Sequence, residues 1–241
     1  MSQDRIYSQP HTAVKDFTFD EQVADVFNDM INRSVPGYTT ILHTIGKLAP
    51  RFVTANSRVY DLGCSLGAAS LAIKRAVDAD GVELLAIDSS EAMVSRAERQ
   101  LSAYKGQVHT QVQQADIRHI DISNASMVVL NFTLQFLPPD DRDALINKVY
   151  AGLRPGGLLL LSEKLVFTDS AINDLLCELH WDFKRDNGYS ELEIAQKRTA
   201  IENVMRPDSP EQHLARLEKA GFSHRQLWYQ CYNFASMVAI K

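Results

Sequence analysis

The sequence predicts an α/β fold in which a mostly parallel, seven-stranded sheet ends in an antiparallel hairpin. Three observations predict it. Short apolar strands alternate with amphipathic helices between residues 58 and 163, an order typical of a parallel sheet with helices on both faces. The last two apolar segments, 226–229 and 234–240, are separated by only a few residues, which indicates a hairpin. The chain between these two regions has almost entirely helical periodicity.

The N-terminal part of the chain precedes the first predicted strand. Residues 1–16 are polar and aperiodic, and we expect them to form a flexible arm. Helical spacing of apolar residues then predicts one helix over 20–33 and a second that begins near Tyr38, separated by Pro36-Gly37. Residues 17–50 are therefore expected to form a helical cover over the edge of the core. Residues 1–241 are expected to form a single domain.

The central region supplies five predicted strands and the helices that connect them. We expect strands at 58–62, 83–87, 108–112, 126–130 and 158–163, and helices at 68–77, 90–104 and 140–153. Ser89 or Ser90 suits the N-cap of the second of these helices. The RPGG segment at 154–157 is expected to form a sharp turn into the fifth strand. Helices at 171–185 and 190–204 then form an insertion, residues 165–205, over the carboxyl edge of the sheet, and another helix follows at 210–220.

Composition excludes several classes of protein. Lys and Arg number 25 and Asp and Glu 30, for a net charge of −5, and no basic run exceeds two residues. Because nucleic-acid binding requires a basic surface, we expect no direct contact with nucleic acid. No apolar run reaches the ~18 residues of a membrane helix, and the first residues lack the apolar stretch of a signal peptide, so we expect a cytoplasmic protein without membrane contact. The three cysteines form no CxxC pair and the histidines are scattered, so no metal site is expected.

The carboxyl ends of the strands carry the residues with recognisable chemistry, because ligands of such sheets bind there. The first strand ends in DLGCSLG, residues 61–67, in which Gly63 and Gly67 allow a tight turn and a close approach to a ligand. Glycines at these positions also occur in purely structural turns. Asp88 ends the second strand, where a carboxylate can accept hydrogen bonds from both hydroxyls of a ribose.

Two further strand ends extend this pattern. Asp116, after the third strand, can accept a hydrogen bond from an adenine amino group while Ile117 covers the ring. Asn131, at the end of the fourth strand, can bond the polar tail of a ligand or satisfy its own loop. Together the four strand ends indicate an adenosine with a short polar extension rather than a pyrophosphate, so a hydride-transfer enzyme is possible but less favoured.

Five longer stretches carry a resemblance to a known family. They are DLGCSLGAAS (61–70), SMVVLNFTLQFL (126–137), LSEK (161–164), DFKRDNGYSELEIAQKR (182–198) and LWYQCYNFASMVAIK (227–241). Over nearly the whole chain from about Asp4, the sequence resembles the carboxy-S-adenosyl-L-methionine synthases, which belong to the class I S-adenosylmethionine-dependent methyltransferases with their Rossmann-like fold. The fourth stretch is the most specific, because it is not general to methyltransferases.

The resemblance implies a reaction other than methyl transfer. S-adenosyl-L-methionine and prephenate give carboxy-S-adenosyl-L-methionine and phenylpyruvate, and the product supplies the carboxymethyl donor for 5-oxyacetyl modification of the tRNA wobble uridine. The resemblance also implies a homodimer, in which the insertion helices are candidates for the subunit contact. The residues that it implies for contact with S-adenosylmethionine are Tyr38, Gly63, Cys64, Ser65, Asp88, Ser89, Asp116, Ile117, Asn131 and Arg198.

Arg198 is the residue for which chemistry suggests a catalytic role. A methyl sulfonium is itself positive and needs no cation beside it, whereas a carboxymethyl sulfonium carries a carboxylate that a guanidinium binds with two hydrogen bonds. We therefore expect Arg198 to hold the product carboxylate and to stabilise negative charge on the transferred carbon. Without the resemblance, an arginine on an exposed helix is an ordinary surface charge. Tyr189 and Lys197 are candidates for holding the substrate only because they lie in the insertion, and the base that removes the methyl proton is not identified.

Three functions stay open on the sequence alone. A carboxylating synthase is favoured because it accounts for Arg198. A conventional S-adenosylmethionine-dependent methyltransferase, acting on a small molecule or on tRNA, accounts equally well for the four strand ends. A binding module that carries the nucleotide as a regulatory ligand is indicated only by Ser65, which occupies the place of the usual glycine.

Overall fold

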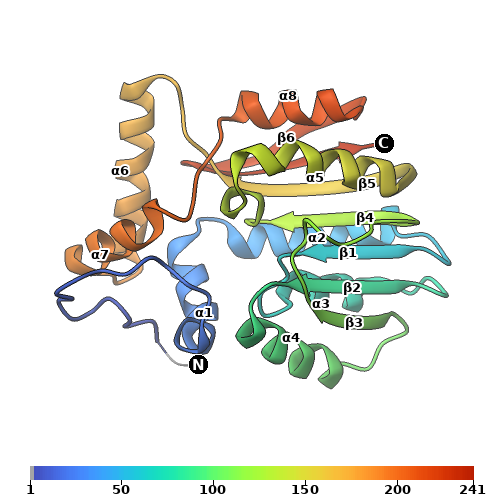
Figure 1. The fold of residues 1–241 in the computed structure, drawn as a ribbon, viewed down its shortest axis with the longest axis horizontal. Coiled ribbons are helices and arrows are strands. Elements are labelled where there is room, and N and C mark those ends of the chain that lie inside the picture. The colour runs from blue at the N-terminus through green and yellow to red at the C-terminus, as the bar shows by residue number, and fades with distance from the viewer. Residues whose placement is uncertain (1–2) are drawn as a thin grey trace.

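The computed structural model describes residues 3–241 and contains one seven-stranded sheet (Figure 1). The strands β1 to β5 are parallel to one another, and β7 pairs antiparallel with both β5 and β6. The predicted sheet and its terminal hairpin are confirmed. In the order β3-β2-β1-β4-β5-β7-β6, the strands are His109–Gln114, Glu83–Asp88, Arg58–Leu62, Ala125–Asn131, Leu153–Lys164, Phe234–Ile240 and His224–Cys231.

Helices cover both faces of this sheet. Successive side chains of β1 point to opposite faces of the sheet. Val59 packs in the apolar layer on one face and Tyr60 in the layer on the other. The first layer is formed by α2 (Tyr38–Phe52), α3 (Ala68–Ala76) and α4 (Glu91–Ala103). The second layer is formed by α5 (Pro139–Gly152) and α8 (Pro210–Ala220).

The remaining helices, α1 (Glu21–Ser34), α6 (Ser170–Asp186) and α7 (Glu191–Glu202), lie beyond the carboxyl ends of the parallel strands (Figure 1). The prediction of an N-terminal cover over the edge of the core is therefore right for α1 but wrong for α2. Ile41 and Ile45 of α2 are fully buried in the apolar layer on one sheet face. The amphipathic spacing of these residues could not show which side of the sheet they would cover.

The segment before α1 is anchored to the insertion. The backbone N–H of Asp4 donates to Asp29 at 2.7 Å, and its buried carboxylate accepts from the Tyr189 hydroxyl. The side-chain amide of Gln196 donates to the carbonyl of Tyr7 at 2.9 Å. The prediction of a flexible arm is wrong for this segment, because partners 185 residues away in the sequence hold it. The first two residues of the predicted arm lie outside the described residues.

The RPGG segment does not precede the fifth strand but lies within it. β5 already pairs at Leu153 with Ala125, and pairing resumes at Leu158 with Met127, so the register shifts between these two points. Gly156, with φ of +77°, allows this irregularity. The predicted sharp turn is thus an interruption inside a longer strand.

A buried polar network fixes the loop that follows β4. This loop contains the 3₁₀ turn η1 (Leu134–Phe136), whose first two backbone N–H groups donate to the Glu163 carboxylate at 2.9 and 2.8 Å. Arg142 of α5 is fully buried and donates to the carbonyls of Leu137 at 2.9 Å and Arg206 at 2.8 Å. Its guanidinium also pairs with Asp208 at 2.8 Å. The network therefore connects α5, η1 and the chain that leads into α8.

Replacing the buried arginine tests this network. Arg142→Ala removes one partner of a buried ion pair and leaves several carbonyls without donors, so we expect the free energy of unfolding to fall by about 3–5 kcal/mol. Urea denaturation measures the change. Arg99→Ala, at an exposed position of α4, is the control and should change stability by less than about 0.5 kcal/mol. Equal losses in the two variants would contradict the assigned role.

Candidate active site

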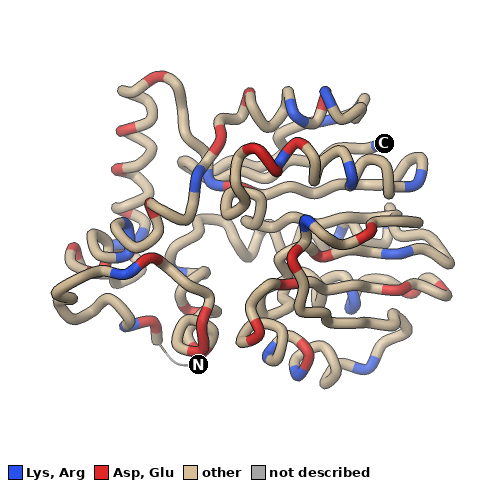
Figure 2. The backbone as a smooth tube through the Cα atoms, in the orientation of Figure 1, with Lys and Arg blue, Asp and Glu red and all other residues tan. Residues whose placement is uncertain are grey.

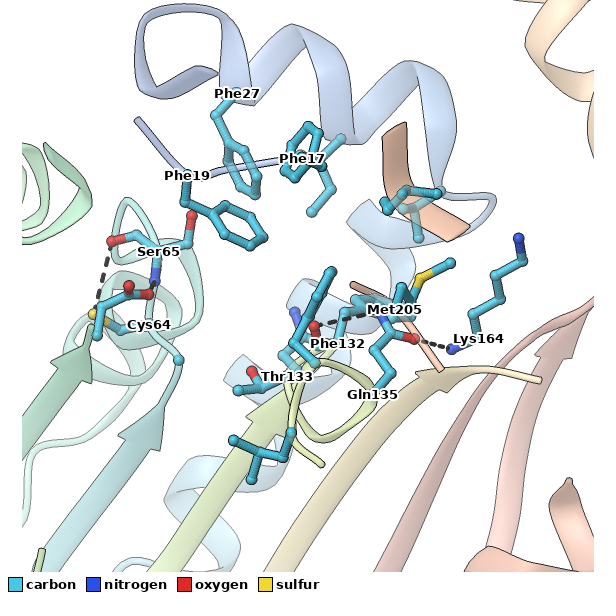
Figure 3. A pocket seen from close by; sticks show the side chains of 18 of the residues that line it. Phe17, Phe19, Phe27, Cys64, Ser65, Phe132, Thr133, Gln135, Lys164 and Met205 are labelled. Carbon is cyan, nitrogen blue, oxygen red and sulfur yellow. Dashed lines mark hydrogen bonds between the residues drawn. The ribbon is translucent and has the colours of Figure 1, made fainter. Parts of the chain in front are cut away.

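A cavity of about 440 Å³ lies at the carboxyl ends of the strands, between the sheet and the helices α1, α6 and α7. In Figure 3, Cys64 and Ser65 lie on one side of it and Lys164 on the other, with Phe132, Thr133 and Gln135 between them. Of the residues predicted to contact S-adenosylmethionine, only Arg198 does not line it. Those that do are Tyr38, Gly63, Cys64, Ser65, Asp88, Ser89, Asp116, Ile117 and Asn131.

The turn after β1 approaches the loop after β4 too closely for a side chain. Gly63 has φ of +81°, and a Cβ atom on it would lie 2.3 Å from the Thr133 side chain. Ser65 also has a positive φ, of +50°, a conformation that glycine adopts without strain. Its backbone N–H donates to the Asp88 carboxylate at 2.8 Å. Serine at position 65, where glycine is usual, therefore still allows the turn, and the hydrogen bond to Asp88 holds it in place.

Asp88 connects this turn to the next helix. Its carboxylate accepts from the Ser65 N–H and, at 2.9 Å, from the Ser90 N–H, while the Ser90 hydroxyl caps α4 by accepting from Met93. The predicted N-cap is confirmed at Ser90. Burial raises the pKa of Asp88, and these backbone donors oppose the rise. Because a carboxylate has about four acceptor positions, Asp88 can also accept from a hydroxyl of a ribose.

Asp116 and Ile117 lie beside each other on the cavity wall, but the carboxylate has a partner that the sequence analysis did not identify. Arg118 donates to both Asp116 oxygens, at 3.0 and 2.6 Å, and also reaches Asp141 at 2.7 Å. These hydrogen bonds lower the pKa of Asp116, which stays ionised. An adenine amino group would therefore share this carboxylate with Arg118. The buried, apolar side chain of Ile117 can pack against the face of an adenine ring.

The other cavity residues differ in polarity. The Asn131 side-chain oxygen is buried without a hydrogen-bond partner among residues 3–241, so an amino group of a ligand would satisfy it. Burial raises the pKa of the Cys64 thiol and of the Tyr38 phenol, which both stay neutral. Unsatisfied acceptors beside apolar walls fit the adenosine and amino group of S-adenosylmethionine.

Arg198 lies outside the cavity. Its side chain is 52% exposed, pairs with Glu202 at 3.4 Å, and places its guanidinium 5.3 Å from the centre of the Trp181 ring. The structure therefore does not bring Arg198 together with the other predicted residues within one chain. Tyr189 also lies off the cavity wall, because its hydroxyl donates to Asp4.

The cavity wall also includes cationic and aromatic residues that the sequence analysis did not assign to the site. Lys164, Lys184 and His180 lie there together with Lys197, which was only a candidate for holding substrate. Lys164 ends the fifth strand, so the strand-end argument used for Asp88 could have identified it. Lys184 gives no such signal, because a single lysine in an amphipathic helix resembles a surface residue. Phe17, Phe19, Phe27 and Phe136 complete the apolar wall.

Neither a membrane span nor a metal cluster is found in residues 3–241. None of the helices there is long and apolar enough to cross a membrane. No group of three or more His, Cys, Asp or Glu side chains in that range is placed to hold a metal ion.

The turn at Gly63 can be tested against a glycine in open space. Gly63→Ala and Gly156→Ala both place an alanine at positive φ, but only the first creates a clash, since no atom lies within 4 Å of a Cβ at 156. We expect Gly63→Ala to cost about 1–3 kcal/mol more stability than Gly156→Ala. We also expect it to weaken S-adenosylmethionine binding by at least about tenfold, because the turn must shift. Denaturation and calorimetry measure both effects, and equal behaviour of the two variants would refute the argument.

Comparison with known proteins places this site in context. The family described as "Methyltransferase domain" matches residues 59–157. A protein from Vibrio vulnificus (strain CMCP6), named carboxy-S-adenosyl-L-methionine synthase, is 60% identical over 99% of this chain and 97% of its own length. Proteins of the same name from Shewanella sp. (strain W3-18-1) and Photobacterium profundum are 60% and 58% identical, over 100% and 99% of this chain and 99% and 98% of their own lengths.

Solved structures share the fold. A putative O-methyltransferase from Nostoc punctiforme has a TM-score of 0.63 at 16% identity, over 92% of this chain and 60% of its own. Human N-acetylserotonin methyltransferase in complex with S-adenosylmethionine has a TM-score of 0.60 at 18% identity, over 92% of this chain and 55% of its own. These likenesses show the class I methyltransferase fold alone. The 60% identity over nearly the whole length shows the family, and the chain belongs to the carboxy-S-adenosyl-L-methionine synthases.

Proposed function

We propose that the protein converts S-adenosyl-L-methionine and prephenate to carboxy-S-adenosyl-L-methionine and phenylpyruvate. The product would supply the carboxymethyl donor for 5-oxyacetyl modification of the tRNA wobble uridine, by a separate enzyme in the cytoplasm. Membership of the family supports this reaction. The observation that carries it within the structure is one cavity with acceptors for an adenosine on its strand-end side and lysines, suited to an anionic second substrate, on the insertion side.

The reaction balances with these two substrates. The positive sulfur acidifies the adjacent methyl group, and loss of a proton from it leaves an ylide carbon with an electron pair. Prephenate loses its ring carboxylate as CO₂ and its ring hydroxyl as hydroxide, and the ring becomes aromatic. The ylide carbon then forms a bond to the carbon of CO₂, and the methyl proton and the hydroxide leave as water.

Within this reaction the strand ends bind and orient the adenosine part. We assign the ribose hydroxyls to Asp88, the adenine edge to Asp116 and Ile117, and the amino group of the methionine part to Asn131. The turn from Gly63 to Ser65 would pass close to the ligand because it carries little bulk. Tyr38, Cys64 and Ser89 complete the wall as neutral groups, which suits a cationic sulfonium better than another positive charge would.

The surface of the insertion supports a homodimer. The large apolar side chains that are exposed among residues 3–241 all lie between positions 166 and 192: they are Val166, Ile172, Leu175 and Leu192, from 38% to 49% exposed. Arg198 lies in the same insertion and outside its own cavity. We propose that this apolar surface pairs two copies, and that Arg198 enters the active site of the other copy.

Arg198→Leu tests the carboxylation. A leucine removes the guanidinium that would hold the new carboxylate, so we expect carboxy-S-adenosyl-L-methionine formation to fall by at least about 100-fold. Binding of S-adenosylmethionine should change by less than about threefold, because its adenosine contacts lie on other elements. Mass spectrometry of the product and calorimetry of binding measure the two effects.

The wild-type protein and Arg99→Leu are the controls for this variant. Both should release phenylpyruvate and form a species heavier than S-adenosylmethionine by one CO₂. Transfer of an unmodified methyl group by the wild type would favour a conventional methyltransferase instead. Unchanged turnover in Arg198→Leu would refute the role of Arg198.

Leu175→Glu tests the proposed homodimer. Leu175 is 49% exposed, so a carboxylate there costs the free chain little but would be buried in a subunit contact. We expect light scattering to show a monomer that binds S-adenosylmethionine and has lost carboxylation. Arg99→Glu, which adds a carboxylate on the exposed side of α4, should stay dimeric and active. A fully active monomer would contradict both the pairing and the action of Arg198 across it.

A further inference from the structure

Three lysines from separate elements meet at one side of the cavity. Lys164 ends β5, Lys184 lies in the last turn of α6, and Lys197 lies in α7. Figure 2 shows Lys and Arg gathering where the end of α6 meets α7, and Figure 3 shows Lys164 opposite Cys64 and Ser65. We call these three residues the lysine subsite. The proposed function places an anionic second substrate beside the lysines of the cavity but does not say which group of that substrate Lys164 or Lys184 holds.

The lysine subsite has more positive charge than its protein partners neutralise. Lys184 is only 8% exposed, yet its ammonium makes no hydrogen bond or ion pair within residues 3–241, and neither does that of Lys164. Lys197, 7% exposed, donates to the Ser34 hydroxyl at 3.1 Å and lies 3.8 Å from the Asp4 carboxylate. A largely buried lysine without an ion-pair partner is costly to keep charged, so an anion beside Lys184 would bind favourably.

Burial lowers the pKa values of these lysines, and repulsion between them adds to the shift of Lys184. Burial, together with Lys197 and Lys164, lowers the pKa of Lys184 to about 7, and burial lowers that of Lys197 to about 8. Asp4 opposes the shift of both pKa values and Asp29 opposes that of Lys197, while Arg198 adds to the shift of Lys184 and Arg33 to that of Lys197. His180 stays neutral, since burial lowers its pKa to about 2 and its Nε2 lies 2.8 Å from the Ser34 carbonyl. The charge of the subsite is therefore that of its lysines.

We propose that the lysine subsite binds the carboxylate of the pyruvyl side chain of prephenate, the one that phenylpyruvate retains. This inference rests on the proposed function. Prephenate has two carboxylates, and only the ring carboxylate leaves as CO₂. Ion pairs to the leaving group would stabilise the charge that decarboxylation removes, and so would slow the step. The retained carboxylate keeps its charge throughout, so a fixed cationic clamp can hold it without opposing the reaction.

The wall beside the subsite suits the ring of the same molecule. Phe132 and Phe234 both line the cavity with ring centres 6.0 Å apart, and Tyr38 lies 6.5 Å from Phe132. Lys164 extends over Phe234, with its ammonium 6.0 Å from the ring centre. These aromatic side chains lie next to the lysine side and carry no charge. A ring held there would have its departing carboxylate in an apolar setting, which favours loss as neutral CO₂.

Lys184→Met tests the assignment, because methionine keeps most of the side-chain volume and removes the charge. We expect KM for prephenate to rise by about 10-fold to 100-fold, the value of a hydrogen bond to a charged group. KM for S-adenosylmethionine should change by less than about twofold. Phenylpyruvate, which has the retained carboxylate and lacks the ring carboxylate, should compete with prephenate, and its inhibition constant should rise by the same factor.

Matched variants distinguish the effect of losing the charge from the effect of a protein that fails to fold. Lys164→Met, at a partly exposed residue, should show the same pattern if Lys184→Met fails to fold, and Lys184→Arg should restore most of the affinity. Lys105→Met, at an exposed loop position, should leave both KM values unchanged. An unchanged inhibition constant for phenylpyruvate would overturn the assignment. A rise in KM for S-adenosylmethionine with none for prephenate would also overturn it, because the lysines would then hold the methionine carboxylate.

The subsite and the proposed function can fail independently. If the wild-type protein releases no phenylpyruvate from prephenate, the proposed function fails. Calorimetric titration of phenylpyruvate into the wild type and Lys184→Met still decides the subsite. Binding that depends on Lys184 would support a site for an aryl-substituted carboxylate, and equal binding by both proteins would reject it.

Discussion

The turn after β1 is held by the end of β2, and the site depends on that attachment. The backbone N–H groups of Gly63 and Cys64 both donate to the Ile87 carbonyl, at 2.8 and 2.9 Å, and the next N–H, of Ser65, donates to Asp88. The polar groups at the end of β2 thus accept hydrogen bonds from the turn that follows β1. Because β1 also pairs with β4, the loop at Thr133 is brought against Gly63. A ligand at this edge thus meets a wall made by three strands at once.

The sequence was informative wherever function follows from the position of a residue relative to a strand. Asp88, Asp116 and Asn131 line the cavity as predicted, because parallel strands end at a common edge of the sheet. Side-chain partners were not predictable in the same way. Arg118 lies only two residues from Asp116, but its bidentate contact depends on a local turn that composition does not specify.

Contacts between residues far apart in the sequence set the larger limit on what the sequence can predict. Periodicity predicts α6 and α7 but not the direction that each face takes, so Lys184 resembles a surface charge, and only the family resemblance places Arg198 at the site. In the structure Lys184 is buried and Arg198 is half exposed. Their positions depend on the angle at which the insertion packs on α1 and on the segment before it. The net charge of −5 likewise gave no indication that positive charge is concentrated at one side of the cavity.

The anchoring of Asp4 has a consequence for the order in which the molecule assembles. Asp4 and its partner Tyr189 are 185 residues apart in the sequence. Closing so long a loop is entropically unfavourable until the sheet has brought the two ends together. The contact of Asp4 with Tyr189 is therefore favourable only once the sheet has brought α1 and the insertion together, and it completes the lysine side of the cavity, where Asp4 also lies 3.8 Å from the Lys197 ammonium.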